Sequence, residues 1–298
     1  MEKNLKTIII TGASSGLGFE TAKKIAKKNC NFRIIMACRN IPKANEKKEE
    51  IEKETKNQNL VVMEIDTSSL ESVKNFVKNY QKSSYGKIYS LVCNAGIGGF
   101  RPPEITKDGF DIIFETNHLG HFLLVKSLLP LMEENGRIFN VSSDMHDPPQ
   151  QMHPNFEWVG AEQLAKPNEE LAKSRIRYSY SKLCNLYFTY ELVKKIKDKK
   201  IYVNAFTPGF MPNTGLGGGK ANPQQIKFVN ENFPERVGDL EKSSQALCDL
   251  ITMDGFTSNG EYFDRSTNTI KTSELSYNEK NAKELWDLSE TYVKNYTL

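Results

Sequence analysis

Short apolar segments alternate with longer amphipathic segments along most of the chain. Each apolar segment is rich in β-branched residues and precedes a turn and a stretch with helical periodicity. This rhythm is typical of βαβ units, in which helices join parallel strands. The expected strands are residues 7–10, 33–37, 60–65, 90–93, 137–141 and 201–206, with a last short strand near 260–263.

These expected strands are apolar almost throughout, as are strands covered by helices on both faces. We therefore expect an α/β fold: a doubly wound parallel sheet of about seven strands with helices on both faces. Sheets of this kind often reach the length of this chain, 298 residues, as one unit. Residues 1–298 are expected to form a single domain.

Two segments interrupt the rhythm, at about 144–174 and about 210–235. The first is rich in Pro, Gln and Asn, and the second carries a glycine cluster at 215–219. Both follow expected strand ends, where open α/β sheets place ligand crevices and lids. We expect the first to be an insert that shapes a substrate pocket and the second to be a lid.

The charge pattern argues against a nucleic-acid partner. The net charge is only +3, from 40 basic and 37 acidic residues that are interspersed. The run over residues 43–56 mixes both signs at helical spacing and indicates a solvated helix face.

Targeting and metal signals are also lacking. The apolar run at residues 7–10 is too short for a signal peptide, and no stretch approaches the roughly 20 apolar residues of a transmembrane helix. The five cysteines, Cys30, Cys38, Cys93, Cys184 and Cys248, are widely spaced and form no CxxC pair. We expect reduced thiols, no metal site and a cytoplasmic protein.

The first chemical signal is the turn over residues 11–18, Thr-Gly-Ala-Ser-Ser-Gly-Leu-Gly, which lies between the first strand and a helix expected at about 19–28. Its glycines allow a tight turn close to a pyrophosphate, and the free N–H groups of the helix stabilise phosphate charge. The GxxxGxG spacing differs from the GxGxxG dinucleotide fingerprint. The context still indicates a Rossmann-type, nucleotide-binding fold.

The second expected strand ends in Met-Ala-Cys-Arg-Asn, with Arg39 where an NAD-binding unit usually has an acidic residue near the ribose 2′-hydroxyl. A guanidinium suits a 2′-phosphate, so NADP(H) is favoured over NAD. A surface arginine without a ligand is the alternative.

Tyr178 and Lys182 lie four residues apart in a helix expected at about 174–197, so their side chains share one face. An ammonium about 4–5 Å from a phenol lowers the phenol pKa from its usual ~10, which suits acid–base catalysis nearer neutral pH. Such pairs arise by chance on many helices, so the other motifs decide their meaning.

The order of motifs resembles the short-chain dehydrogenase/reductase family from about residue 7 to residue 214. The motifs are the glycine turn, Asn94-Ala95-Gly96, Asn117, Asn140-Val141-Ser142-Ser143, Tyr178 with Lys182, and Pro208-Gly209. The segments around Arg39, Asn117 and Lys182, and the run Leu-Trp-Asp-Leu-Ser at 285–289, are most similar to the branch of retinol dehydrogenases, the WW-domain oxidoreductase and protochlorophyllide reductase.

The resemblance implies four catalytic residues. Tyr178 exchanges the proton at the substrate oxygen, and Lys182 binds the nicotinamide ribose and lowers the pKa of Tyr178. Ser143 polarises the substrate carbonyl, while the side chain of Ser142 points into the protein and has a structural role. Asn117 anchors a water in the proton relay.

The resemblance also implies an NADP(H) site. Its expected members are Gly12, Ser14, Ser15, Gly16, Leu17 and Gly18 at the phosphates, Arg39 at the 2′-phosphate, Asp66 and Thr67 near the adenine, Asn94, Ala95 and Gly96 along adenosine and ribose, and Pro208, Gly209, Thr214, Tyr178 and Lys182 near the nicotinamide. His118 and His121 are expected to have structural roles.

The resulting hypothesis is hydride transfer between NADP(H) and a carbonyl or alcohol of a hydrophobic small molecule of retinoid, steroid or aldehyde type. Two alternatives stay open: reduction of a tetrapyrrole C=C bond, for which Cys184 is a candidate residue, and a non-catalytic NADP(H)-sensing module.

Phe156 and Trp158 of the insert either contact substrate or pin the insert to the core. A homo-oligomer, dimer or tetramer, is expected from the resemblance, and a monomer stays possible.

Overall fold

The computed structural model describes residues 5–28, 31–98, 102–173, 176–211, 216 and 223–297, and within these ranges seven strands form one parallel sheet. The strand order is β3-β2-β1-β4-β5-β6-β7. Because the order reverses between β1 and β4, the sheet has a switch point there, where open α/β sheets bind ligands. The strands are β1 Lys6–Thr11, β2 Phe32–Cys38, β3 Leu60–Glu64, β4 Ile88–Cys93, β5 Met132–Val141, β6 Ile201–Phe206 and β7 Tyr262–Phe263.

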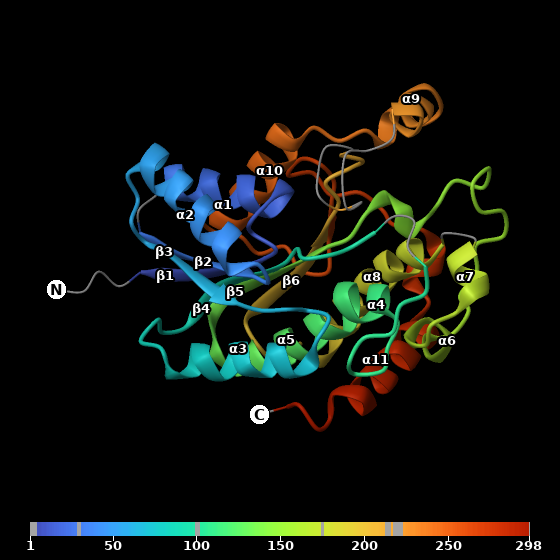
Figure 1. The fold of residues 1–298 in the computed structure, drawn as a ribbon, viewed down its shortest axis with the longest axis horizontal. Helices are drawn as coiled ribbons and strands as arrows, with labels where there is room; N and C mark the ends of the chain where they lie inside the picture. The colour runs from blue at the N-terminus through green and yellow to red at the C-terminus, as the bar shows by residue number, and fades with distance from the viewer. Residues whose placement is uncertain are drawn as a thin grey trace.

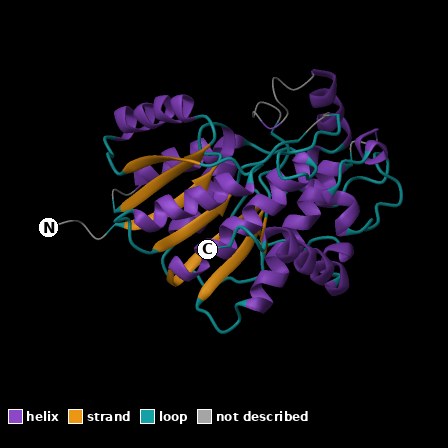
Figure 2. Ribbon diagram, turned by 60° about the horizontal axis from the view of Figure 1, so that its bottom comes forward, coloured by secondary structure: helices purple, strands orange, loops and turns teal. Residues whose placement is uncertain are grey.

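Helices cover both faces of the sheet, as Figure 1 shows, and the strands lie side by side between them (Figure 2). On one face lie α1 Gly16–Lys28, α2 Ile41–Thr55 and α10 Leu240–Thr252. On the other lie α3 Leu70–Lys82, α5 Gly120–Leu128, α8 Arg177–Lys195 and α11 Glu279–Val293. The shorter helices are α4 Ile112–Phe114, a π-helical turn over Glu115–Leu119, α6 Ala161–Ala165, α7 Glu169–Lys173 and α9 Pro223–Asn232.

The alternation of side chains along β1 explains the two layers. Ile8 and Ile10 join a hydrophobic cluster with residues of α1 and α10, whereas Ile9 joins a second cluster with residues of α3, α5 and α8. All three isoleucines are fully buried. Successive side chains of a strand point to opposite faces, so a strand with helices on both sides is apolar at every position. The α/β, doubly wound single domain expected from the sequence is confirmed.

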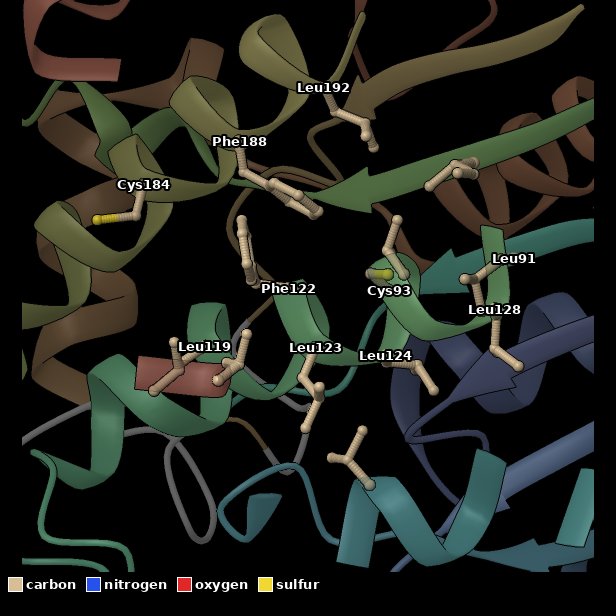
Figure 3. Close-up of a cluster of buried hydrophobic side chains, with 14 of the residues drawn as sticks. Leu91, Cys93, Leu119, Phe122, Leu123, Leu124, Leu128, Cys184, Phe188 and Leu192 are labelled. Atoms are coloured by element: carbon tan, nitrogen blue, oxygen red, sulfur yellow. The ribbon is translucent and has the colours of Figure 1, made fainter. Parts of the chain in front are cut away.

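The second cluster is centred on α5 and α8 (Figure 3). Phe122 of α5 and Phe188 of α8 lie with their ring centroids 5.3 Å apart, and Trp286 of α11 packs edge-on against Phe122 at 5.0 Å. The C-terminal helix α11 therefore covers the outer side of these two helices. Among the described helices, none has the length and apolar character needed to cross a lipid bilayer.

Element boundaries differ from the prediction mainly at β5. This strand starts at Met132, which pairs with Ile88, and its register then shifts before Arg137 pairs with Ser90. Asn135 within this irregularity has a φ of 62°, a backbone region that Asn tolerates better than most residues. The polar residues Glu133 and Glu134 hide this first half of the strand from a search for apolar runs.

Candidate active site

A cavity of about 390 Å³ lies along the carboxyl ends of the strands. Gly12 after β1, Arg39 after β2, Asp66 after β3, Asn94 after β4 and Pro208 after β6 all line it. Residues distant in sequence meet there because parallel strands all end at the same edge of the sheet.

The cavity brings together most of the residues that the sequence predicts at a nucleotide site. Those lining it are Gly12, Ser14, Ser15, Gly16, Leu17, Arg39, Asp66, Thr67, Asn94, Ala95, Gly96, Tyr178, Lys182 and Pro208. Gly18 and Gly209 are outside this lining, and Thr214 and much of the expected lid (212–215 and 217–222) are outside the described residues.

The glycines of the first turn are required by close packing. Gly12 has a φ of 67°, and a Cβ placed on it would lie 3.0 Å from the Cα of Ala95. A Cβ on Gly18 would lie 2.6 Å from Nδ2 of Asn94, which itself donates to the carbonyl of Thr11 at 2.8 Å. Only glycine lets the loops after β1 and β4 approach this closely. Gly18 therefore shapes the turn without lining the cavity.

The turn leads directly into α1, whose first residues Gly16 and Leu17 line the cavity together with Ser14 and Ser15. The first N–H groups of a helix lack intrahelical partners and carry the positive end of the helix dipole. This end of the cavity is therefore suited to an anionic group such as a phosphate.

Two cations lie where β2 passes into α2. The Arg39 guanidinium is 3.8 Å from the Asp66 carboxylate and largely exposed, and Lys43 also lines the cavity. Lys43 is absent from the sequence prediction, which assigned the run 43–56 to a solvated helix face. The residue that could have indicated Lys43 in the sequence is Asn40. Its side chain accepts a hydrogen bond from the Lys43 amide and caps the start of α2 beside the cavity.

Tyr178 and Lys182 lie on one face of α8, as their spacing predicts. The Lys182 Nζ is 5.4 Å from the centre of the Tyr178 ring and donates to the Val141 carbonyl at 3.0 Å. Burial lowers the pKa of Lys182 to about 8, because the charged ammonium is removed from water.

The pKa of Tyr178 differs from the sequence expectation. Burial raises it to about 12, while a hydrogen bond with Ser143 acts in the opposite direction and the nearby Asp144 carboxylate raises it further. The Lys182 ammonium is directed to the Val141 carbonyl, so in this arrangement Ser143 is the group that favours the phenolate. The sequence could not reveal this, because it does not show how deeply the phenol is buried.

Asn117 lies in the π-helical turn and ties the loop after β4 to α8. Its Nδ2 donates to the Ile97 carbonyl at 2.8 Å and to Ser181 Oγ at 2.9 Å, while its Oδ1 accepts from the Ile97 amide at 2.8 Å. Ser181 in turn donates to the carbonyl of Tyr178 at 2.7 Å. Asn117 is thus joined to the backbone of Tyr178 through one side chain.

The neighbouring histidines and Ser142 make hydrogen bonds within the protein, and Ser142 also lines the cavity. His118 is hydrogen-bonded to Ser289 and His121 to Thr11, each at 2.9 Å. Burial lowers their pKa values to about 3 and about 4, so both rings are neutral near pH 7. Ser142 donates to the Lys182 carbonyl at 2.8 Å.

Two features left open by the sequence are now placed. Phe156 stacks on Tyr180 with ring centroids 4.6 Å apart, and Trp158 donates to Glu284 of α11 at 3.0 Å, so both pin the insert to the body of the protein. Cys184 is fully buried in the cluster of Figure 3 and is not part of the cavity lining.

Comparison with known proteins agrees with this fold. A family model described as short chain dehydrogenase matches residues 6–155. The chain is 32% identical to human (Homo sapiens) retinol dehydrogenase 14, covering 97% of this chain and 86% of the relative. It is 30% identical to the WW domain-containing oxidoreductase of Gallus gallus, covering 97% and 68%. The crystal structure of an uncharacterized protein from Mycobacterium Paratuberculosis superimposes with a TM-score of 0.70 at 27% identity, covering 97% and 93%. The chain therefore belongs to the short-chain dehydrogenase/reductase family.

Proposed function

We propose that this oxidoreductase transfers a hydride between NADP(H) and a carbonyl or alcohol group of a hydrophobic small molecule. The observation that supports this best is the composition of one continuous cavity. Its one end has the glycine turn and the N-terminus of α1, and its other end has Tyr178 and Lys182, with Ser143 hydrogen-bonded to Tyr178. A phosphate site and an acid–base pair in one cavity suit a dinucleotide and a reacting carbonyl.

The residues of the cavity fit an NADP(H) molecule. The close approach of Gly12 to Ala95 leaves a cradle that a Cβ would fill, and the first turn of α1, with its free N–H groups, lines the cavity where it would hold a phosphate. Arg39 and Lys43 supply positive charge for a 2′-phosphate. Asp66 and Thr67 also line the cavity and would hold the adenine end. When bound, the nicotinamide supplies or accepts the hydride.

The chain's own groups handle the proton. Because its pKa is raised to about 12, the Tyr178 phenol is protonated near neutral pH and can donate to the oxygen of a carbonyl as that oxygen gains charge. Ser143 orients the same oxygen and, through its hydrogen bond to Tyr178, favours the phenolate that results. Lys182 holds the Val141 carbonyl and so keeps the end of β5 beside α8.

Part of the cavity wall is apolar. Ile97, Met211 and Leu216 line the cavity together with Tyr178. Apolar walls with a few placed polar groups favour a hydrophobic substrate whose single reactive oxygen meets Ser143 and Tyr178.

The test is NADPH oxidation with a panel of aldehydes and ketones, including retinoids and steroids. Tyr178→Phe removes the proton donor, and we expect activity to fall by about 100-fold or more, the contribution of a general acid. Tyr180→Phe is the matched control, because its hydroxyl donates to the Glu157 carbonyl away from the cavity lining. Full activity in Tyr178→Phe would contradict the mechanism. NADPH binding without carbonyl reduction would favour a sensing module, and light-dependent turnover of protochlorophyllide would favour C=C reduction.

A further inference from the structure

The ring of Tyr178 lies directly against the backbone of Gly98. A Cβ placed on Gly98 would be 3.0 Å from Cδ2 and 3.1 Å from Cε2 of Tyr178. Ordinary van der Waals contact at such a position is 3.4–4 Å. The absence of a side chain at Gly98 therefore makes room for the phenol ring.

The backbone at Gly98 does not itself require glycine. The described glycines with positive φ, which L side chains rarely adopt, include Gly12 and Gly209, but Gly98 is not among them. An alanine could adopt this conformation without backbone strain. The cost of a methyl group at this position thus comes from the side chains that it meets, and Tyr178 is the nearest of them.

Gly98 also joins two loops over the phenol. Its amide donates to the carbonyl of Leu216 at 3.0 Å, which links the loop after β4 to the segment after β6. The Cγ of Leu216 would lie 3.6 Å from a Cβ on Gly98, an ordinary contact. The ring of Tyr178 is therefore bounded by the Gly98 backbone, by the Lys182 ammonium, and by Ser143 at its hydroxyl.

We propose that Gly98 is a positioning residue for Tyr178: its bare backbone forms a wall against the phenol ring and so directs the hydroxyl to Ser143 and to the reacting oxygen. This inference rests on the proposed function, because it assigns Gly98 an effect on catalysis through Tyr178. Gly98 itself is not part of the cavity lining.

The chemical consequence of a methyl group at this position can be derived from the surroundings of the phenol. To relieve contacts of 3.0 and 3.1 Å, the ring must move by a few tenths of an ångström. This movement weakens the hydrogen bond with Ser143, the contact that favours the phenolate. Lys182 and Asp144 are the charged groups around the phenol, and neither is touched by the substitution.

The experiment is a cycle of three variants, Gly98→Ala, Leu216→Ala and the double variant, each assayed for kcat, for NADPH affinity and for the pH dependence of kcat. We expect Gly98→Ala to lower kcat by about tenfold, because small misplacements of catalytic groups are costly. NADPH affinity should stay within about twofold of wild type. The limb of the pH profile that reports Tyr178 should move to higher pH. Removing the Leu216 side chain should not restore kcat, because the contact at fault is with Tyr178.

Three results would overturn the proposal: unchanged kcat in Gly98→Ala, a rise in KM alone with the same pH profile, or full rescue by Leu216→Ala. Titration of the Tyr178 phenol by NMR in wild type and Gly98→Ala, with Tyr178→Phe to assign the signal, gives a readout that needs no substrate. If wild type reduces no carbonyl, the proposed function fails, while a higher phenol pKa in Gly98→Ala still supports the positioning of Tyr178 and an unchanged value refutes it.

Discussion

Arg39 and Lys43 are cationic side chains that line the cavity, one at the end of β2 and one in the first turn of α2. We predict that Arg39→Ala raises the KM for NADPH by about 10-fold or more and changes the KM for NADH little, since a hydrogen bond to a charged group contributes roughly 1.5–3 kcal/mol. Steady-state kinetics with both cofactors measures this. Lys47→Ala, one turn further along α2 where the ammonium pairs with Glu50, is the control. An equal loss with NADPH and NADH would count against a 2′-phosphate contact.

The residues of the site were predictable to different degrees. Tyr178 and Lys182 could be paired from sequence because helix geometry places residues four apart on one face. Arg39 and Asp66 could be placed because parallel strands end at a common edge. Gly98 and the high pKa of Tyr178 could not, because they depend on how closely the loop after β4 approaches α8, which no local pattern encodes.

The π-helical turn over Glu115–Leu119 joins α4 to α5 and contains a fully buried carboxyl group, that of Glu115. Burial raises the pKa of Glu115 to about 9; the Asp108 carboxylate raises it further, and Thr106 opposes the shift. Between its ordinary value of 4.5 and about 9, the folded protein retains a proton that the unfolded chain releases. The contribution of Glu115 to stability is therefore fully present below 4.5 and is lost as the pH rises toward 9, by up to about 1.4 kcal/mol per pH unit.

We predict that Glu115→Gln, which is neutral at every pH, removes this part of the pH dependence. The variant should gain stability relative to wild type between pH 5 and pH 9, as measured by the free energy of unfolding in urea. Glu49→Gln on the exposed side of α2 serves as the control. Parallel curves for wild type and Glu115→Gln would show that Glu115 is already ionised in the folded protein.

The sequence predicted which helices and strands are present better than it predicted where each one begins and ends. The apolar strands of the sheet were recognisable because both faces are covered. The π-helical turn was not, because it differs from an α-helix only in the backbone hydrogen bonds around Asn117, and the residues on either side have an ordinary helical pattern.

The C-terminal helix α11 packs over the outer side of α5 and α8. Trp286 of α11 contacts both Phe122 of α5 and Phe188 of α8, and Ser289 is hydrogen-bonded to the buried His118. The family resemblance favours oligomers built on long helices, but in this chain α11 covers the apolar faces of α5 and α8. We therefore expect that the wild-type chain does not associate with itself through this face and behaves as a monomer in light scattering.

Replacing Trp286 by Ala tests whether α11 is what keeps this face covered. Loss of its contacts with Phe122 and Phe188 should lower the free energy of unfolding by about 2–3 kcal/mol, below the cost for a fully buried tryptophan because Trp286 is only partly buried. The exposed phenylalanines should then promote concentration-dependent association, measurable by size-exclusion chromatography with light scattering. Lys283→Ala on the outer side of α11 removes only an exposed ion pair with Asp287 and should change neither property. A dimeric wild type that dissociates in Trp286→Ala would mean that α11 forms the interface between subunits instead of covering the face within one chain.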